Sequence, residues 1–232
     1  MAIALLQAGA DPNGGAHSGR LGKIGDRRKR KKVFRSGPMH IASLKGDADL
    51  VRELLRAKAK FNLPDANGLF PLHLAATGEN PSQKRQATDE DKRRLDCVKS
   101  LLQAGSPLYM KDGNRQSLIH CAARAGNYAL LEYILPIWKA GRGEKDFRGS
   151  SLDWRDHWGR TGVHWAILNG HLDTLKLLLR HGCSPEPAAF KENTKRSSIA
   201  LESPLQLCER LYGTTESVGL EIASVLMARI DN

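Results

Sequence analysis

Apolar residues recur along this chain in short blocks with the three- and four-residue spacing of a helix face. Two blocks show the spacing clearly: Val51, Leu54 and Leu55 in one, and Leu172, Leu175, Leu178 and Leu179 in the other. Such spacing puts the apolar side chains on one side of a helix and leaves the opposite side polar. The pattern predicts a series of short amphipathic helices, each of which must bury one face against a neighbour.

A six-residue sequence motif, called the phrase below, also recurs. Each copy lies at the start of a helix that comes before one of these amphipathic helices. The phrase reads GPMHIA, FPLHLA, SLIHCA, TGVHWA and SPLQLC, ending at Ala42, Ala75, Ala122, Ala166 and Cys208. An internal repeat of this kind indicates one small unit stacked many times. The small residue before the helix is expected to cap its free amides, and the alanines are expected to let neighbouring helices approach closely.

The position of the histidine in each phrase gives the length of each repeat in residues. Its successive positions are separated by 33, 47, 44 and 42 residues, the last being occupied by Gln206. An apolar pair follows the histidine after 14 residues in three units, but after 28 residues between His73 and Leu101. The extra residues therefore lie between the two helices of that unit. Because Asp89, Glu90 and Asp91 suit a helix start, we expect a long second helix from about 89 to 103.

The recurring phrase resembles the T-P-L-H-x-A signature of ankyrin repeats, and the resemblance extends along the whole chain. It implies an all-α ankyrin-repeat solenoid of helix-turn-helix units with enlarged inter-repeat loops. The first expected units are the second half of a truncated repeat (1–13) and a basic inserted loop (14–35). Four repeats follow, at 36–64, at 65–111 with an insertion at 77–94, and at 112–155 and 156–202, each with a long loop. The last unit is a degenerate repeat or cap (203–232).

The resemblance assigns the repeated residues to structure. It implies that the histidine of each unit bonds to the backbone of the loop and the adjacent repeat, at His40, His73, His120 and His164. A glycine six residues later is expected to end the first helix in a left-handed conformation, at Gly46, Gly126 and Gly170. Turn residues at 65–68 and 156–159 are expected at the loop tips.

No motif for catalysis or for a cofactor is found in the sequence. Nucleophile elbows, HExxH zinc motifs and phosphate-binding glycine loops are all missing. The cysteines, Cys97, Cys121, Cys183 and Cys208, lack metal-ligand spacing, so buried thiols are expected instead of zinc ligands or disulfides. We therefore predict no enzyme, no catalytic or metal site and no cofactor.

The net charge of +11 is concentrated in one segment. Residues 14–36 hold nine Lys or Arg residues and one acid, which leaves +3 for the rest of the chain. Its centre is the run Arg27, Arg28, Lys29, Arg30, Lys31 and Lys32. The run is a candidate nuclear-import signal or a contact for an acidic partner or nucleic acid, and the alternative is a solvated insertion without a role. Nucleic acid is the weaker choice, since only Phe34 could stack on a base.

Three of the four tryptophans fall within twelve residues, from 154 to 165. Trp165 takes an apolar position of the phrase and is expected in the core. Trp154, Arg155, His157 and Trp158 lie in the preceding loop and are candidate partner contacts, because Trp and Arg dominate interface energetics. The alternative is that these side chains pack over their own loop.

The function expected from the resemblance is a non-catalytic scaffold that binds another protein, with the nuclear-import machinery as a further candidate partner. Because the chain begins within a repeat, the first alternative is an ankyrin targeting arm of a larger enzyme, ubiquitin ligase or channel. The second is nucleic-acid or acidic-partner binding through residues 27–32. We expect no membrane span and an intracellular location, cytoplasmic or nuclear, which suits unpaired cysteines.

Overall fold

The computed structural model describes residues 2–14, 36–78, 89–140, 152–185, 203–213 and 217–230, and these residues form helices, turns and loops without a strand. The helices are α1 (Ala2–Gln7), α2 (Pro38–Lys45), α3 (Ala48–Arg56), α4 (Pro71–Thr77), α5 (Asp89–Gln103), α6 (Leu118–Ala125), α7 (Tyr128–Ala140), α8 (Gly162–Leu168), α9 (Leu172–Arg180), α10 (Pro204–Tyr212) and α11 (Ser217–Ile230).

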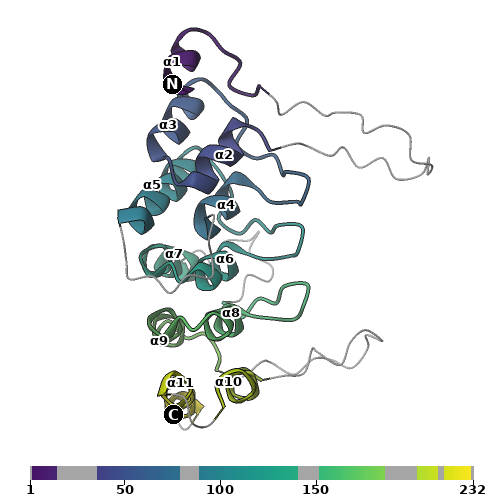
Figure 1. The fold of residues 1–232 in the computed structure, drawn as a ribbon. Coiled ribbons are helices and arrows are strands. Elements are labelled where there is room, and N and C mark those ends of the chain that lie inside the picture. Colours follow the sequence, from purple (N-terminus) through teal and green to yellow (C-terminus); the bar gives the residue numbers. More distant parts are fainter. Residues whose placement is uncertain are drawn as a thin grey trace, which may run out of the picture.

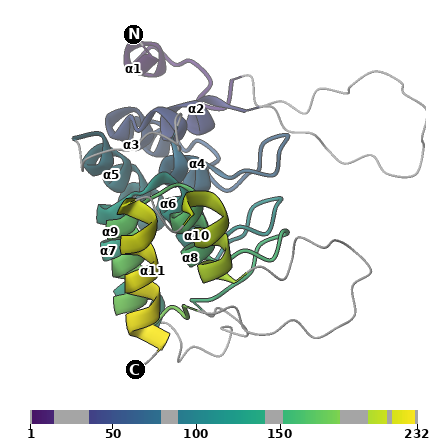
Figure 2. The ribbon, with the colours of Figure 1, turned by 60° about the horizontal axis from the view of Figure 1, so that its bottom comes forward.

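The helices form two parallel layers in one elongated stack (Figure 1). Helices α2, α4, α6, α8 and α10 make the inner layer, and each packs on the next along the stack. Helices α3, α5, α7, α9 and α11 make the outer layer, with α1 beside α3. Figure 2 shows the last pair, α10 and α11, closing one end. The predicted all-α solenoid of helix-turn-helix units is confirmed.

The core runs without interruption along the stack, between the two layers. Its smallest members are the predicted alanines of the inner helices, each at most 1% exposed: Ala42, Ala75, Ala122 and Ala166. Large residues of the outer helices, such as Leu54 and Leu178, fill the space opposite them. No single pair could cover both of its apolar faces, so stability depends on contacts between neighbouring pairs.

The helix starts differ from the sequence-based expectation in one respect. Hydroxyl groups were expected to cap the first helices, but the Ser117 and Thr161 hydroxyls instead hydrogen-bond Nδ1 of the histidine three residues later, at 2.8 and 2.9 Å. That Nδ1 also accepts from the Ser117 backbone N–H at 3.1 Å. The expectation was wrong at these helices because the histidine competes for the hydroxyl. Ser203 alone among the described first helices caps as expected, accepting from the Gln206 N–H at 3.1 Å.

The ends of the inner helices adopt the left-handed conformation at the expected glycines. The φ angles are 68° at Gly46, 68° at Gly126 and 69° at Gly170. At the N-terminal end of the stack, Asn13 Oδ1 accepts from the Lys60 N–H at 2.8 Å. This bond joins the segment after α1 to the turn after α3. Residues 2–13 thus pack as an outer-layer element.

Helix α5 has the bounds predicted from the insertion, and Arg94 anchors its first turns to the inner layer. The Arg94 side chain is only 3% exposed. Its Nη1 donates to the Leu44 carbonyl at 3.2 Å, and Nη2 pairs with Glu90 on the same helix. A buried guanidinium must keep such partners to offset its lost hydration.

Several expected features lie outside the described residues. These are the basic run 27–32, residues 79–88 of the insertion and the greater part of each long loop. Among the described helices, none is both long and apolar enough to cross a membrane.

Candidate protein-docking surface

Three hairpins of the same design project from the inner layer on one side of the stack (Figure 1). They comprise residues 65–69, 112–116 and 156–160. In each, Oδ1 of the first aspartate accepts from the backbone N–H groups two and four residues later, at 2.7 to 2.9 Å. The aspartate N–H donates back to the carbonyl of the last residue at 2.8 to 3.0 Å. A short acceptor side chain followed by turn-forming residues produces this closed loop.

Backbone hydrogen bonds join the three hairpins into one hairpin row. The Gly113 N–H donates to the Gly68 carbonyl at 2.9 Å, and the His157 N–H donates to the Asn114 carbonyl at 2.8 Å. The approach at the first junction is so close that a Cβ on Gly68 would lie 2.7 Å from the Gly113 Cα. The row therefore forms a continuous edge.

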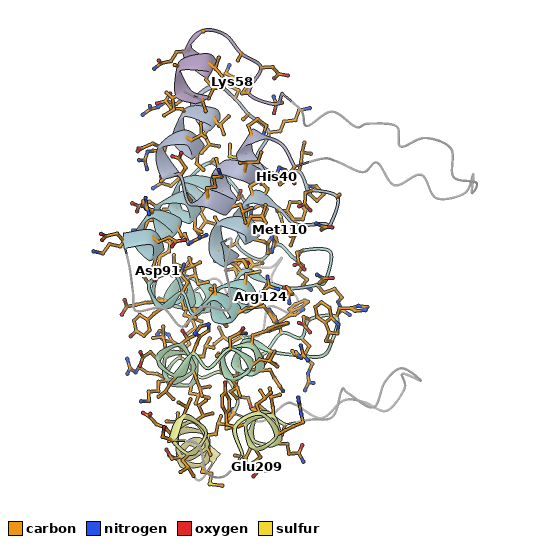
Figure 3. The ribbon with its side chains drawn as sticks, viewed as in Figure 1. His40, Lys58, Asp91, Met110, Arg124 and Glu209 are labelled. Carbon is orange, nitrogen blue, oxygen red and sulfur yellow. The ribbon has the colours of Figure 1, made fainter. Side chains whose placement is uncertain are left out.

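The repeated histidines hold this row against the inner helices. The Nε2–H of His40 donates to the Leu63 carbonyl at 2.9 Å. The same group of His73 donates to the Met110 carbonyl at 3.1 Å, and that of His120 donates to the Arg160 carbonyl at 3.0 Å. Figure 3 shows His40 and Met110 on the side of the stack that carries the hairpins. At His40 and His120 both ring nitrogens are engaged, since Nδ1 accepts from a backbone N–H. The fourth, His164, has Nδ1 bonded in the same way at 3.2 Å from the Thr161 N–H.

Burial favours the neutral form of three of these rings. It lowers the pKa of His73 to about 4, against an ordinary value of 6.5, and the carbonyl of Met110 only partly counteracts it. Burial also lowers the pKa of His40 and of His120. A neutral ring bonded through Nε2 to the backbone suits a structural role better than acid–base chemistry near pH 7.

These pKa shifts predict that the fold weakens in acid. Between pH 6.5 and about 4 the unfolded chain binds a proton at residue 73 and the folded chain does not, so stability falls as pH falls. His73 alone accounts for about 3 kcal/mol across that window. The chain supplies the replacement to test it, since Gln206 stands at the equivalent position and its Oε1 accepts from the Ser203 N–H at 2.9 Å.

The measurement is urea unfolding of the original chain and of His73→Gln at pH 7.5 and 5.0. The variant is expected to lose about 2 kcal/mol less stability between the two pH values. Equal losses would show that His73 does not titrate on unfolding.

A cluster of tryptophan and arginine side chains lies where the third hairpin meets α6 and α8. Trp165, on α8, is 8% exposed, in agreement with its expected core position. The guanidinium carbons of Arg124 and Arg160 lie 5.5 and 5.1 Å from the centre of its ring. Its Nε1–H donates to Asp156 Oδ2 at 2.9 Å. Both contacts with the arginines are within cation–π range.

The four candidate contact residues of the sequence analysis occupy different positions in the third hairpin and its approach. Trp158 is 43% exposed and meets Trp165 edge-on, with ring centres 6.3 Å apart. His157 is exposed beside it, at 5.9 Å. Trp154 and Arg155 are half-buried, and the Arg155 Nη1 donates to the Gly159 carbonyl at 3.3 Å. A contact with a partner stays a prediction for all four.

The second hairpin adds charge to the same region. Lys111 places its Nζ 2.7 Å from the centre of the Trp154 ring. The pKa of Lys111 is lowered, first by desolvation and then by the charge of Arg115. Arg115 is exposed at the hairpin tip.

The backbone of Arg115 is unusual for a residue with a side chain. Its φ is 61°, and the same hairpin position holds Gly68 with φ 78° and Gly159 with φ 75°. The sequence analysis missed Arg115, together with Lys111, Arg124 and Arg160. Aligning DANGL, DGNRQ and DHWGR would have revealed the exchange of glycine for arginine.

We call the second and third hairpins with their flanking cations the hairpin patch, consisting of Lys111, Arg115, Arg124, Arg155, Arg160, Trp154, His157, Trp158 and Trp165. The first aspartates of these hairpins turn Oδ1 inward to their own backbone. Within the described part of the chain, no carboxylate forms an ion pair with Arg115, Arg124 or Arg160. The patch is therefore a basic and aromatic surface.

The described residues offer little else for chemistry. They contain no group of three His, Cys, Asp or Glu side chains able to hold a metal ion. None of the four cysteines forms a disulfide with another described residue, and all four are buried, as predicted. Desolvation raises the pKa of Cys97 to about 12 and that of Cys121 to about 11, so both remain protonated thiols.

Comparison with known proteins confirms the repeats. Residues 86–189 match ankyrin repeats in three copies. The chain is similar to inversin of Canis lupus familiaris, 25% identical over 198 residues, which covers 76% of this chain and 16% of inversin. It is also similar to the poly(ADP-ribose) polymerase tankyrase of Caenorhabditis elegans, 23% identical over 182 residues, which covers 75% of this chain and 7% of that protein.

A third relative is the probable 26S proteasome regulatory subunit p28 of Saccharomyces cerevisiae. It is 25% identical over 174 residues, or 73% of this chain and 64% of p28. The chain thus spans about a sixth of inversin and less than two thirds of p28. What these relatives share with the chain is the repeat, and repeats of this kind bind other proteins and are generally non-catalytic.

Proposed function

We propose that this stack of ankyrin repeats is a non-catalytic scaffold that binds another protein along the hairpin row and the adjoining inner helices. The observation that carries the proposal is the row itself, in which backbone hydrogen bonds join hairpin to hairpin while side chains at the tips stay exposed. A surface fixed in this way needs little ordering when a partner binds, which favours affinity.

The chemistry of the described residues supports a binding role over a catalytic one. Catalysis needs a base and its partner to converge in one cleft. Here the buried histidines are neutral and bonded to the backbone, and the thiols of Cys97 and Cys121 are held protonated. Such groups stabilise the surface and leave recognition to the exposed side chains.

An alternative is that this chain is the targeting arm of a larger enzyme, ubiquitin ligase or channel. The observation in its favour is the small share of inversin and tankyrase that the match covers. Sequencing the transcript in both directions would decide it, since an open frame that ends at these residues would exclude the alternative.

A cytoplasmic or nuclear location is part of the proposal, since four cysteines without a disulfide among the described residues suit a reducing compartment. The basic run 27–32 would then act as an import signal or as a second contact for nucleic acid or an acidic partner. A fluorescent fusion with alanine at these six positions tests the import role, and an unchanged distribution would exclude it.

Photo-crosslinking tests the binding role directly. We expect benzoylphenylalanine in place of His157, at the tip of the row, to capture a discrete protein in cell extract. The same residue in place of Arg180, exposed at the end of α9 in the outer layer, is the matched control and should not. The captured protein, once purified, should bind the unmodified chain reversibly. Equal capture from both positions, or from neither, would contradict docking on the hairpin row.

A further inference from the structure

We propose that the segment bound by the hairpin patch is an acidic peptide of a partner protein, rich in Asp and Glu and carrying apolar side chains between them. This inference rests on the proposed function and specifies the chemistry of the partner. It is carried by three features of the patch: a strained arginine, a pair of arginines without acidic partners and one open tryptophan.

The strained arginine is Arg115. A side chain at φ 61° costs stability that glycine avoids, and the equivalent positions of the other two hairpins do hold glycine. The Arg115 side chain is exposed and forms no ion pair within the described residues. Its position at the tip of the second hairpin, beside the third, makes its charge accessible to a partner on the row.

The second feature is the pair of guanidinium groups beside Trp165. Arg124 lies on α6 and Arg160 on the third hairpin, so two separate elements bring like charges to one ring. Within the described residues, the Arg124 side chain donates to the Thr77 hydroxyl at 3.3 Å, its buried Nε has no hydrogen-bond partner, and Asp112 is near enough for its pKa to be lowered by the Arg124 charge without forming an ion pair. Guanidinium groups held in this way can bind carboxylates through two parallel hydrogen bonds.

The third feature is Trp158, the most exposed tryptophan of the patch. One edge of its ring rests on Trp165 and His157 lies beside it, yet 43% of the residue remains open to solvent. A large rigid aromatic beside arginines is the usual composition of an interface hot spot. It would accept an apolar side chain that lies between two acidic ones.

The first hairpin provides an internal contrast. Its residues after the aspartate are Ala66, Asn67, Gly68 and Leu69, which carry no charge and no aromatic ring. The charge is therefore placed on two hairpins of three and is not a property of the repeat. This limits the acidic segment to the part of the row between Lys111 and Arg160.

Nucleic acid fits the same patch less well. Single-stranded nucleic acid binds by stacking bases on open aromatic faces. Trp165 is 8% exposed with guanidinium groups near its ring, and the Trp154 ring is covered by Lys111 Nζ. Only Trp158 among the tryptophans of the patch is free enough to stack, and one ring provides little affinity.

A random dodecapeptide library displayed on phage, selected on the intact chain, is the probe. We expect the selected peptides to be enriched in Asp and Glu with interspersed apolar residues. The strongest of them, labelled with fluorescein, should bind more weakly as salt concentration rises, because exposed charges are screened. Exchange of its acids for Gln and Asn should abolish measurable binding.

Two glycine substitutions then separate recognition from stability. Arg115→Gly is expected to raise the melting temperature by about 2–4 °C, because strain is relieved. It is also expected to weaken peptide binding about fivefold, as a lost charge pair would. The matched control is Lys58→Gly. Lys58 has φ 59° where the corresponding turns hold Gly9, Gly105 and Gly182, so it should gain the same stability with unchanged binding.

Arg160→Gln provides the second binding variant, with an expected loss of about fivefold and little change in melting temperature. The proposal is overturned if the selected peptides are neutral or basic, if Arg115→Gly and Arg160→Gln bind as well as the intact chain, or if a single-stranded 12-nucleotide probe binds the patch in place of acidic peptide. If one of these results is obtained but crosslinking from position 157 is still observed, the acidic-peptide proposal fails and the proposed scaffold function is retained. Loss of that crosslinking would remove both.

Discussion

Replacing Gly78 with alanine is expected to lower the free energy of unfolding by about 4 kcal/mol. Gly78 follows α4 with φ 71° and ψ −174°, a conformation that is essentially restricted to glycine and costs other residues about 1–3 kcal/mol. A Cβ there would also lie 2.0 to 2.3 Å from three atoms of the Arg94 guanidinium. The guanidinium would have to move, and a buried cation deprived of hydrogen bonds adds about 2 kcal/mol.

Gly213→Ala is the matched control. Gly213 follows α10 with φ 63° and ψ −169°, nearly the same conformation, but a Cβ there would meet no atom of the described residues within 4 Å. Urea unfolding should therefore show only the conformational cost, about 1–3 kcal/mol. If the two substitutions cost the same, Arg94 is not wedged against Gly78. A double variant, Gly78→Ala with Arg94→Met, should recover part of the loss, because no guanidinium then remains to be displaced.

Arg94 also shows where prediction from the sequence stops. The apolar pairs and the recurring histidine were sufficient to predict the two layers, and the doubled interval after His73 predicted helix α5 with its bounds. Nothing in a local pattern indicates that a cation in the acidic, polar start of α5 is 3% exposed. Its partner Leu44 is fifty residues away and its steric neighbour Gly78 belongs to another helix. Periodicity assigns faces to a helix but does not identify the atoms that meet across faces.

Only part of the hairpin patch was identified from the sequence, for the same reason. Trp154, Arg155, His157 and Trp158 were identified because they are consecutive, unusual residues in one loop. Arg115 and Arg124 join them only through the cross-links between hairpins and between helices, such as the bond from His157 to Asn114. The exchange of glycine for arginine at position 115 was nevertheless visible in the aligned repeats, once the repeat is taken as the reference for what each position requires.

The helix caps illustrate a different limit. A small hydroxyl residue precedes α6, α8 and α10, but at Ser117 the histidine three residues on competes for the hydroxyl and accepts from the backbone N–H as well. Two local preferences conflict there, and the three-dimensional position of the histidine, tied by Nε2 to the next loop, decides between them.

Asp156 joins the third hairpin, the hairpin row and the tryptophan cluster. We therefore expect Asp156→Ala to lower the free energy of unfolding by about 4 kcal/mol. Its Oδ1 accepts from the Trp158 and Arg160 N–H groups, both at 2.9 Å, and its Oδ2 accepts from Trp165 Nε1 at 2.9 Å and from Gln116 Nε2 at 3.2 Å. The residue is 3% exposed, so alanine would leave buried donors without partners.

Asp65→Ala is the control that distinguishes the contribution of Asp156 Oδ1 to stability from that of Oδ2. Asp65 forms the same two Oδ1 bonds, to the Asn67 and Leu69 N–H groups, without a bond from another hairpin or from a tryptophan. Its loss should cost about 2 kcal/mol, roughly half that of Asp156. Chemical unfolding measures both, and tryptophan fluorescence should change only for Asp156→Ala, because only that variant removes the partner of the Trp165 ring. Equal costs and unchanged fluorescence would mean that Oδ2 contributes nothing. In that case the Trp165 cluster, and with it the position of Arg124 and Arg160, would be held by packing alone.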